Sequence, residues 1–224
     1  MGNSASHGTS ESSDRRDHIL DVAERLFADR GFAATSMRQI ANAAGVNVAT
    51  LYYHCDNKEH LFLALHERVI ATMAAIVSEA LSEGGDFLQL AEKLMDSVVD
   101  FLARNPAICR LLVRSDLGEL NTVRGSIRST SRPLYQLVYG ELKHRADRGE
   151  IRRVDPATFL AGATGAIFYM LMALHQRSED GKVDERALKL VQEQARHFVF
   201  GAVVLDATAS GAKSGSDATT AGEA

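Results

Sequence analysis

Apolar residues recur three or four positions apart along most of this chain, and that spacing limits the fold more than any other feature. The first such segment places on one helical face the residues Ile19, Val22, Ala23, Leu26 and Phe27. Residues that favour helix ends, such as Gly31, Gly45 and Gly149, separate the segments. The chain also has only 3 prolines, 6% aromatic residues and no tryptophan. We therefore predict an all-α protein and exclude a β-sandwich or β-barrel.

The helix-end signals predict nine helices. Their expected starts lie near Asp14, Ser36, Val48, Asp56, Leu88, Pro106, Pro133, Pro156 and Asp184. Ser36 and Gln39 form an S-x-x-Q capping box for the second helix. We expect Asp56 to cap a long fourth helix that ends near Gly84-Gly85, and Pro133 to start or kink the seventh.

Both ends of the chain are poor in large apolar residues. Residues 1–13 and 207–224 cannot bury enough apolar surface to offset the entropy of ordering, so both are predicted to be disordered tails. Met1-Gly2 opens a myristoylation pattern, but no polybasic patch follows, and a flexible start is the preferred interpretation. Between the tails, a chain of 224 residues with 46% hydrophobic residues can fill a substantial core.

Charge argues against a protein that binds nucleic acid over its whole surface. The chain has 25 Lys and Arg residues, 29 Asp and Glu residues and a net charge of −4. Residues 14–60 hold six basic and seven acidic side chains, so this part is nearly neutral as well. Any DNA binding must therefore come from a few placed contacts on a local surface.

Catalytic and metal-binding signatures are absent from the sequence. It contains no G-x-S-x-G, P-loop or dinucleotide-binding G-x-G-x-x-G motif. His54, His60 and His66 follow one another at six-residue steps, each about 240° around a helix, so they do not converge on a metal. Cys55 and Cys109 form no C-x-x-C pair and fit a reducing compartment. We predict no enzyme activity, no metal and no cofactor.

The second and third predicted helices are short and are joined across Ala44-Gly45-Val46. This is the geometry of a helix-turn-helix, whose second helix enters the major groove of DNA. From Ile40 the chain reads IANAAGVNVATLYYHCDNKEHLF, which resembles the signature of the TetR (tetracycline-repressor) family of bacterial transcriptional regulators.

The resemblance implies a nine-helix architecture in two domains. Residues 14–60 would form an N-terminal three-helix helix-turn-helix DNA-binding domain, and residues 61–206 a C-terminal helical ligand-binding and dimerisation domain. The protein would be a cytoplasmic homodimer that binds a double-stranded DNA operator, acts as a repressor and is released by a lipophilic small molecule. The effector, the operator and the regulated genes are not specified by the sequence, nor is repression rather than activation.

The resemblance also assigns DNA contacts position by position. The predicted DNA-binding residues are Ser36, Arg38, Asn47, Val48, Ala49, Thr50, Tyr52, Tyr53, His54 and Lys58. Ser36 and Arg38 would contact phosphates at the start of the second helix, because a helix N-terminus and a guanidinium both attract anions. His54 and Lys58 would hold the flanking DNA backbone.

Three features of the third helix qualify this assignment. Tyr52 and Tyr53 point about 100° apart on a helix, so at least one should face outward rather than serve as a packing residue. Cys55 replaces the aromatic residue usual in the family, and an inert buried thiol is preferred there over a redox sensor. Val48 stands where members often carry a polar base reader; it can contact a thymine methyl but forms no side-chain hydrogen bond.

The region from residue 61 onward is expected to supply the dimer interface and the ligand site. The eighth predicted helix carries small residues that let another helix approach closely: Ala161, Gly162, Ala163, Gly165 and Ala166. By analogy with the family, this helix and the ninth would pair with a second copy of the chain. A pocket among the fifth to eighth helices would be lined by Phe101, Leu112, Tyr135, Tyr139, Phe168 and Met172. Ordinary core packing is the alternative at each position.

Two further patterns leave alternatives open. Pro156 to Leu174 carries no charge over 19 residues, close to the length of a membrane span, but we expect a soluble helix buried on all sides and no membrane partner. Arg124, Arg128 and Arg132 form a basic stripe that faces either solvent or an anionic ligand such as an acyl thioester. The alternative to a regulator is a helical interaction or membrane-associated module without sequence-specific DNA binding.

Overall fold

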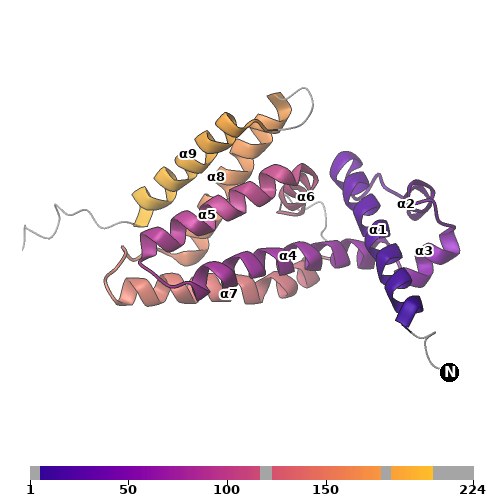
Figure 1. Ribbon diagram of the computed structural model, residues 1–224, viewed down its shortest axis with the longest axis horizontal. Coiled ribbons are helices and arrows are strands. Elements are labelled where there is room, and N and C mark those ends of the chain that lie inside the picture. Colours follow the sequence, from indigo (N-terminus) through magenta and orange to yellow (C-terminus); the bar gives the residue numbers. More distant parts are fainter. Residues whose placement is uncertain (1–5, 117–122, 178–182, 204–224) are drawn as a thin grey trace, which may run out of the picture.

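A computed structural model describes residues 6–116, 123–177 and 183–203, and this part of the chain is entirely helical. Its helices are α1 (Ser6–Arg30), α2 (Met37–Ala43), α3 (Val48–His54), α4 (Lys58–Ser82), α5 (Phe87–Arg104), α6 (Pro106–Asp116), α7 (Arg124–Asp147), α8 (Pro156–Arg177) and α9 (Glu185–Val203). Helices α1 to α3 lie at one end of the molecule, and α4 runs from them into the larger C-terminal bundle (Figure 1). The all-α class and the nine predicted helices are confirmed for the described residues.

Three predicted helix starts are wrong. The first helix begins at Ser6 rather than Asp14, so residues 6–13 are not a tail. A helix already anchored by packed turns gains one backbone hydrogen bond for each residue added, and this needs no apolar pattern. Asn57 rather than Asp56 caps α4, since its side-chain oxygen accepts a 2.7 Å hydrogen bond from the His60 N–H. The predicted tail over 207–224 lies outside the described residues.

The third correction concerns α7, which begins at Arg124 and contains Pro133 in its interior. Proline cannot donate the backbone hydrogen bond that would reach Ser129. Both residues are exposed, so water can satisfy the carbonyl that is left without its helical partner. The prediction that Pro133 starts this helix is therefore wrong, because the helix begins nine residues earlier and continues through the proline.

The N-terminal helices close a small hydrophobic core that also draws on the larger bundle. Its centre includes Phe27 and Phe62, whose rings lie 5.8 Å apart, and Phe32 packs against both. The buried residues that α4, α6 and α7 with its cap contribute to this core are Leu61, Phe62, Leu65, Leu111 and Val123. The predicted division at residues 60 and 61 falls in the first turn of α4, so the first core extends beyond it.

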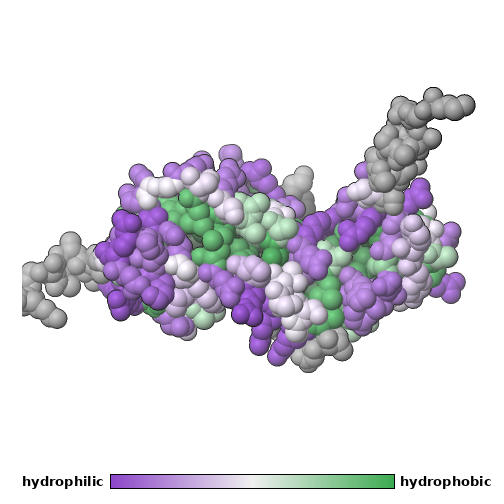
Figure 2. All heavy atoms as spheres, turned by 90° about the horizontal axis from the view of Figure 1, so that it is seen from below, coloured by the Kyte–Doolittle hydropathy of each residue, from purple (hydrophilic) through white to green (hydrophobic). Residues whose placement is uncertain are grey.

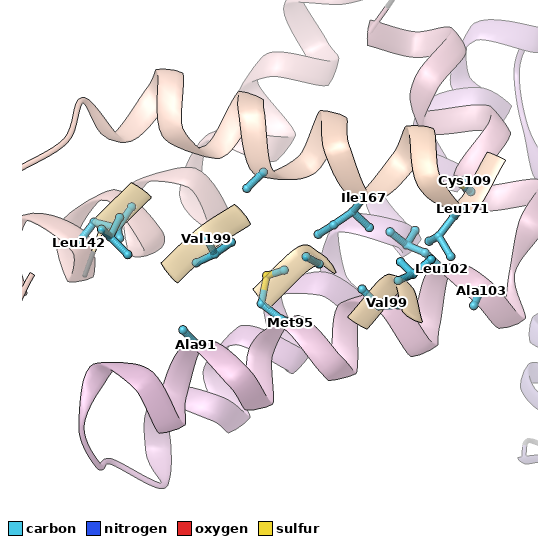
Figure 3. Close-up of a cluster of buried hydrophobic side chains, with 14 of the residues drawn as sticks. Ala91, Met95, Val99, Leu102, Ala103, Cys109, Leu142, Ile167, Leu171 and Val199 are labelled. Carbon is cyan, nitrogen blue, oxygen red and sulfur yellow. The ribbon is translucent and has the colours of Figure 1, made fainter. Parts of the chain in front are cut away.

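The C-terminal bundle is built around a second, larger core. Figure 3 shows Met95, Val99 and Leu102 of α5 facing Ile167 and Leu171 of α8. Helix α9 adds Val191, Ala195, Val199 and Val203 to the same cluster. Helix α4 packs along α7 and against α5, so it belongs to both cores and links the two ends of the molecule.

Helices α4 and α8 are each long and apolar enough to cross a membrane by length and composition alone. Core packing explains α4, whose buried residues include Leu61, Leu65 and Val69. The expectation that α8 is buried on all sides is wrong, because Ala163, Ile167 and Leu171 are buried while Tyr169 is 78% exposed. Helix α8 contacts its neighbours along one side only. Apolar residues are also exposed on the face of the C-terminal bundle shown in Figure 2.

His66 of α4 is a buried polar residue at the contact with α7. Its Nε2 lies 2.9 Å from the Ser131 hydroxyl oxygen, and both side chains are buried. Burial lowers the pKa of His66 below its ordinary value, and the backbone of Ile127 opposes this shift in part. The imidazole is therefore held neutral in the folded protein at neutral pH.

We expect the protein to lose stability in mild acid through His66. Below about pH 6.5 the His66 imidazole takes up a proton in the unfolded chain but not in the folded chain. The free energy of unfolding therefore falls with pH, by at most about 1.4 kcal/mol per pH unit. The loss ends below the lowered pKa of the folded state. His66→Gln should flatten this slope in urea unfolding between pH 7 and 5. Equal slopes for wild type and His66→Gln would contradict the assignment.

Candidate nucleic-acid interface

Helix α2 begins with a complete capping box. The Ser36 hydroxyl oxygen accepts a 3.3 Å hydrogen bond from the Gln39 N–H, and the Gln39 side-chain oxygen accepts a 2.8 Å hydrogen bond from the Ser36 N–H. The predicted box is confirmed. Ser36 and Arg38 are both exposed at this end of the helix. A positive helix end and a guanidinium thus lie together on the surface, which suits a phosphate.

A sharp turn joins α2 to α3. Gly45 has a φ of +66°, the left-handed region that glycine enters without strain. The Val46 N–H then donates to the Ala41 carbonyl at 3.0 Å. The Asn47 side-chain oxygen accepts a 2.7 Å hydrogen bond from the Thr50 N–H and caps α3. Asn47 therefore fixes where α3 begins, besides any contact with DNA.

Helix α3 has one inward and one outward face. Leu51 is fully buried and holds the helix on the first core. The outward face presents Val48, Tyr52 and Tyr53, whose exposed fractions are 38%, 47% and 82%. The alternative that the tyrosines are packing residues is wrong for both. Ala49 is also exposed, and His54 is half-buried with its ring 5.2 Å from that of Tyr53.

Lys58 is partly buried and forms contacts within the protein that the sequence did not predict. Its Nζ donates to the backbone carbonyls of Phe32 and Thr35, each at 2.9 Å, and lies 4.4 Å from the centre of the Phe32 ring. Two of its three protons are thus used to fasten α4 to the loop before α2. Contact with a DNA phosphate stays a prediction for the third proton.

Replacing Lys58 with methionine should destabilise the fold. The change leaves two carbonyls without their charged donor, so we expect a loss of about 1–3 kcal/mol in the free energy of unfolding. The matched control is Lys93→Met, because Lys93 forms an exposed ion pair with Glu83 and should cost under about 1 kcal/mol. Urea unfolding of both variants checks this. Equal, small losses would show that the Lys58 contacts contribute little.

Three acidic residues of α1 form ion pairs with arginines of the C-terminal bundle. Arg68 of α4 pairs with Asp21 and Glu24 at 2.7 and 2.8 Å, and Arg110 of α6 pairs with Asp29 at 2.9 Å. These three carboxylates account for much of the negative charge counted in residues 14–60. Three of the seven acidic side chains in residues 14–60 are therefore paired with arginines of the bundle, whereas Asp14 lies beside the turn before α3.

Two α1 side chains near α3 were missed by the sequence reasoning. Arg15 and His18 line an open surface hollow together with the acidic Asp14 and with Val46, Asn47 and Thr50. Helical periodicity assigns both residues to the polar face of α1 but does not show that this face borders the turn. Their position next to the start of α3 extends the candidate interface by a guanidinium and an imidazole, with the Asp14 carboxylate beside them.

Cys55 ends α3 as a partly buried thiol. Its Sγ donates to the Leu51 carbonyl at 3.3 Å, and the side chain packs against the first core. Burial raises the pKa of Cys55, and the nearby Asp56 adds to the rise. Burial raises the pKa of Cys109 to about 11. Both thiols are thus protonated at neutral pH, which favours packing over redox chemistry.

The residues predicted to line a ligand pocket fall into two groups. Phe101, Leu112, Phe168 and Met172 are partly buried and pack against the second core. Tyr135 and Tyr139 instead form a ring pair on α7, with centroids 6.0 Å apart and Tyr135 42% exposed. Four residues of the six are thus brought to one cluster. Whether any of them touches a ligand stays a prediction.

Helices α8 and α9 expose apolar side chains next to small residues. Tyr169, Leu190 and Phe198 are exposed. Gly165 is exposed as well, and a Cβ at this position would have no neighbouring atom within 4 Å. A Cβ on Gly162, by contrast, would lie 3.4 Å from the Phe198 ring. The two glycines therefore differ: Gly162 lets α9 approach within the chain, whereas Gly165 opens to the surface.

Together, the capped α2, the turn at Gly45 and the exposed face of α3 define a helix-turn-helix protein. Residues 19–65 match the family model described as bacterial regulatory proteins, tetR family. The chain therefore carries the helix-turn-helix of the TetR family, as the sequence resemblance implied.

Comparisons with known proteins agree with this assignment. The chain is 32% identical over 103 residues to the HTH-type transcriptional activator FasR of Mycolicibacterium smegmatis, an alignment that covers 46% of this chain and 47% of FasR. It thus spans about half the length of that relative. It is 27% identical over 190 residues to the HTH-type transcriptional repressor AcnR of Corynebacterium diphtheriae, covering 83% of this chain and 94% of AcnR.

The fold is shared with solved structures. AibR in complex with isovaleryl coenzyme A and operator DNA superposes with a TM-score of 0.66 at 22% identity, covering 83% of this chain and 98% of AibR. At this identity the similarity establishes the fold alone. The helix-turn-helix and the C-terminal helices of this chain are thus arranged as in the fold of AibR.

Proposed function

We propose that this protein is a ligand-responsive transcriptional regulator, a repressor rather than an enzyme, that acts in the cytoplasm on a double-stranded DNA operator. The observation that carries the proposal is the outward face of α3, where Val48, Tyr52 and Tyr53 are exposed while Leu51 fixes the helix from behind. Tyrosine hydroxyls reach phosphate oxygens, and valine contacts a thymine methyl. The positive start of α2, with Ser36 and Arg38, supplies a further phosphate site.

We assign the DNA-binding domain to residues 14–60 and the ligand-binding and dimerisation domain to residues 61–206. Two copies of the chain would pair through α8 and α9, because these helices expose Tyr169, Leu190 and Phe198 beside the open Gly165. A homodimer presents two α3 helices to half-sites about 34–36 Å apart, which a partly palindromic operator requires.

The effector is a lipophilic small molecule held in the C-terminal bundle. Phe101, Leu112, Phe168 and Met172, which already cluster around the second core, are the proposed lining. AibR binds isovaleryl coenzyme A, and FasR and AcnR are transcriptional regulators. Helix α4 belongs to both cores, so a ligand that shifts α4 also shifts the spacing of the recognition helices in the dimer.

The experiment has two stages. DNA fragments of the source genome that the protein binds are selected first, and a library of acyl thioesters and other lipophilic compounds is then screened for release of the selected operator. For any compound found, affinity is measured with and without saturating operator. A coupling of about 1–3 kcal/mol weakens both ligands by the same 5- to 150-fold. No selected DNA would refute the regulator, and equal ligand affinities would refute the coupling.

A second candidate, a helical membrane-associated module, rests on the length and composition of α4 and α8. Flotation of the intact protein with lipid vesicles tests it. Recovery in the dense fraction supports the regulator, and recovery with the vesicles supports the module.

A further inference from the structure

The outer face of α7 carries three arginines followed by two tyrosines. Arg124, Arg128 and Arg132 recur every four residues, and Tyr135 and Tyr139 continue the same helical stripe. All three arginines are exposed, whereas Val123, Ser131 and Leu142 turn inward. At about 1.5 Å per residue the arginines span about 12 Å and the whole stripe about 22 Å. We call these five residues the arginine–tyrosine face.

The arginine–tyrosine face begins with a positive charge at the N-terminus of α7, where the helix dipole disfavours cations. Helix α7 starts at Arg124, and its first turn contains no acidic residue. No side chain in the described residues caps this start, whereas Asp86, Asp155 and Asp184 accept backbone hydrogen bonds at the starts of α5, α8 and α9. Cations at the positive helix end, repeated every four residues, repel both the helix dipole and one another.

The three arginines form no ion pair or hydrogen bond within the part of the chain that the structure describes. Other arginines of the protein do: Arg68, Arg110 and Arg196 each pair with a carboxylate. Among the described residues, no carboxylate balances the charge on the arginine–tyrosine face. A bound anion with several oxygens would offset the repulsion and accept the guanidinium hydrogen bonds.

The tyrosine end adds a site for a flat ring. The Tyr135 and Tyr139 rings lie 6.0 Å apart with 37° between their planes, and Tyr135 is exposed. Exposed aromatic rings stack on nucleobases of any identity. Arginines can bind phosphates, and the tyrosines that follow them on the same stripe can stack on a base. The stripe therefore matches a ligand that carries both phosphates and a base.

We infer that the arginine–tyrosine face binds a phosphorylated nucleotide, with phosphates on the arginines and the base on the tyrosines. The nucleotide is either free or is the polar end of a coenzyme A thioester. If the nucleotide belongs to a coenzyme A thioester, it is part of the effector of the proposed regulator. Only this identification of the effector rests on the proposed function. Binding to the face itself needs no operator, so it is tested without DNA.

The test is calorimetric titration of the full chain with coenzyme A, an acyl coenzyme A, adenosine 3′,5′-bisphosphate, ATP and adenosine. The phosphorylated compounds should bind, more weakly as salt rises, and adenosine should bind at least about 10-fold more weakly. Preference for the acyl thioester identifies it as the source, and equal binding of ATP identifies free nucleotides. No binding of any phosphorylated compound at millimolar concentration overturns the inference.

Variants locate the site. Arg128→Ala should weaken binding about 5-fold, the Arg128→Ala/Arg132→Ala pair about 25-fold, and Tyr139→Ala about 5-fold or more. Arg128→Lys keeps the charge but loses the planar fork, so its loss should be smaller than that of Arg128→Ala. The matched control is Arg186→Ala, at an exposed arginine of α9, which should leave affinity unchanged. Losses equal to this control overturn the inference.

A separate measurement keeps this inference distinct from the proposed function. Operator binding by the Arg128→Ala/Arg132→Ala protein without ligand should equal that of wild type. A weakened operator affinity would show that this face contacts DNA and would overturn the nucleotide assignment. A protein that binds nucleotide through these arginines but selects no DNA would support the inference and refute the proposed regulator.

Discussion

Replacing Tyr53 with alanine is expected to weaken operator binding about 30-fold without loss of stability. The side chain is 82% exposed, so its removal from the free protein should change the free energy of unfolding by less than about 0.5 kcal/mol. In the complex each subunit loses a DNA contact of about 1 kcal/mol. The dimer therefore loses about 2 kcal/mol of binding free energy, which is about 30-fold in affinity. Tyr52→Ala should act in the same direction.

The conservative change Tyr53→Phe separates the hydroxyl from the ring. If the hydroxyl donates to a phosphate, Tyr53→Phe weakens binding as much as Tyr53→Ala. If the ring packs on the sugar-phosphate backbone, Tyr53→Phe binds like wild type. Fluorescence anisotropy with a selected operator measures both. Unchanged affinity in both Tyr52→Ala and Tyr53→Ala would contradict the assignment of α3 as the recognition helix.

Replacing Gly165 with leucine is expected to break the dimer and leave the monomer folded. A Cβ on Gly165 meets no atom of its own chain within 4 Å, so the monomer has room for the larger side chain. Leucine is also the better helix former. Across a symmetric interface the side chain is inserted twice, and overpacking of about 1–3 kcal/mol per copy weakens assembly by at least about 30-fold.

The control for Gly165→Leu is the same change at Gly140, which lies exposed in α7 and also has open space around its Cβ. Sedimentation should show monomers for Gly165→Leu and dimers for Gly140→Leu, with operator affinity lost only in the first. Gly162→Leu is less informative, because the added side chain would press on Phe198 of its own chain. Dimers of Gly165→Leu with wild-type operator affinity would place the interface elsewhere.

Local sequence rules predicted the parts of the site that depend on near neighbours. The capping box at Ser36, the turn at Gly45 and the start of α3 after Asn47 each involve residues within five positions of one another. Hydrogen bonds over such short separations follow from residue type and spacing. The inward position of Leu51 follows in the same way from helical periodicity.

What the sequence could not predict depends on residues far apart in the chain. The contacts of Lys58 with Phe32 and Thr35 span 26 and 23 residues, and no periodic pattern relates those positions. The pairing of Arg110 with Asp29 spans 81 residues. The exposed side of α8 was missed for a related reason, since an apolar helix has the same composition whether one chain or two cover it.

The first core has a consequence for any attempt to exchange the helix-turn-helix end of this chain for that of another protein. Its buried side chains include Leu111 of α6 and Val123 beside α7, as well as the first turns of α4. A chimera joined after residue 60 would carry α1 to α3 away from these partners and leave apolar surface uncovered on both pieces. A working chimera must instead take α1 to α3 together with the parts of α4, α6 and α7 that they pack against. The proposed DNA specificity and the proposed ligand response would then be exchanged together, not as separate modules.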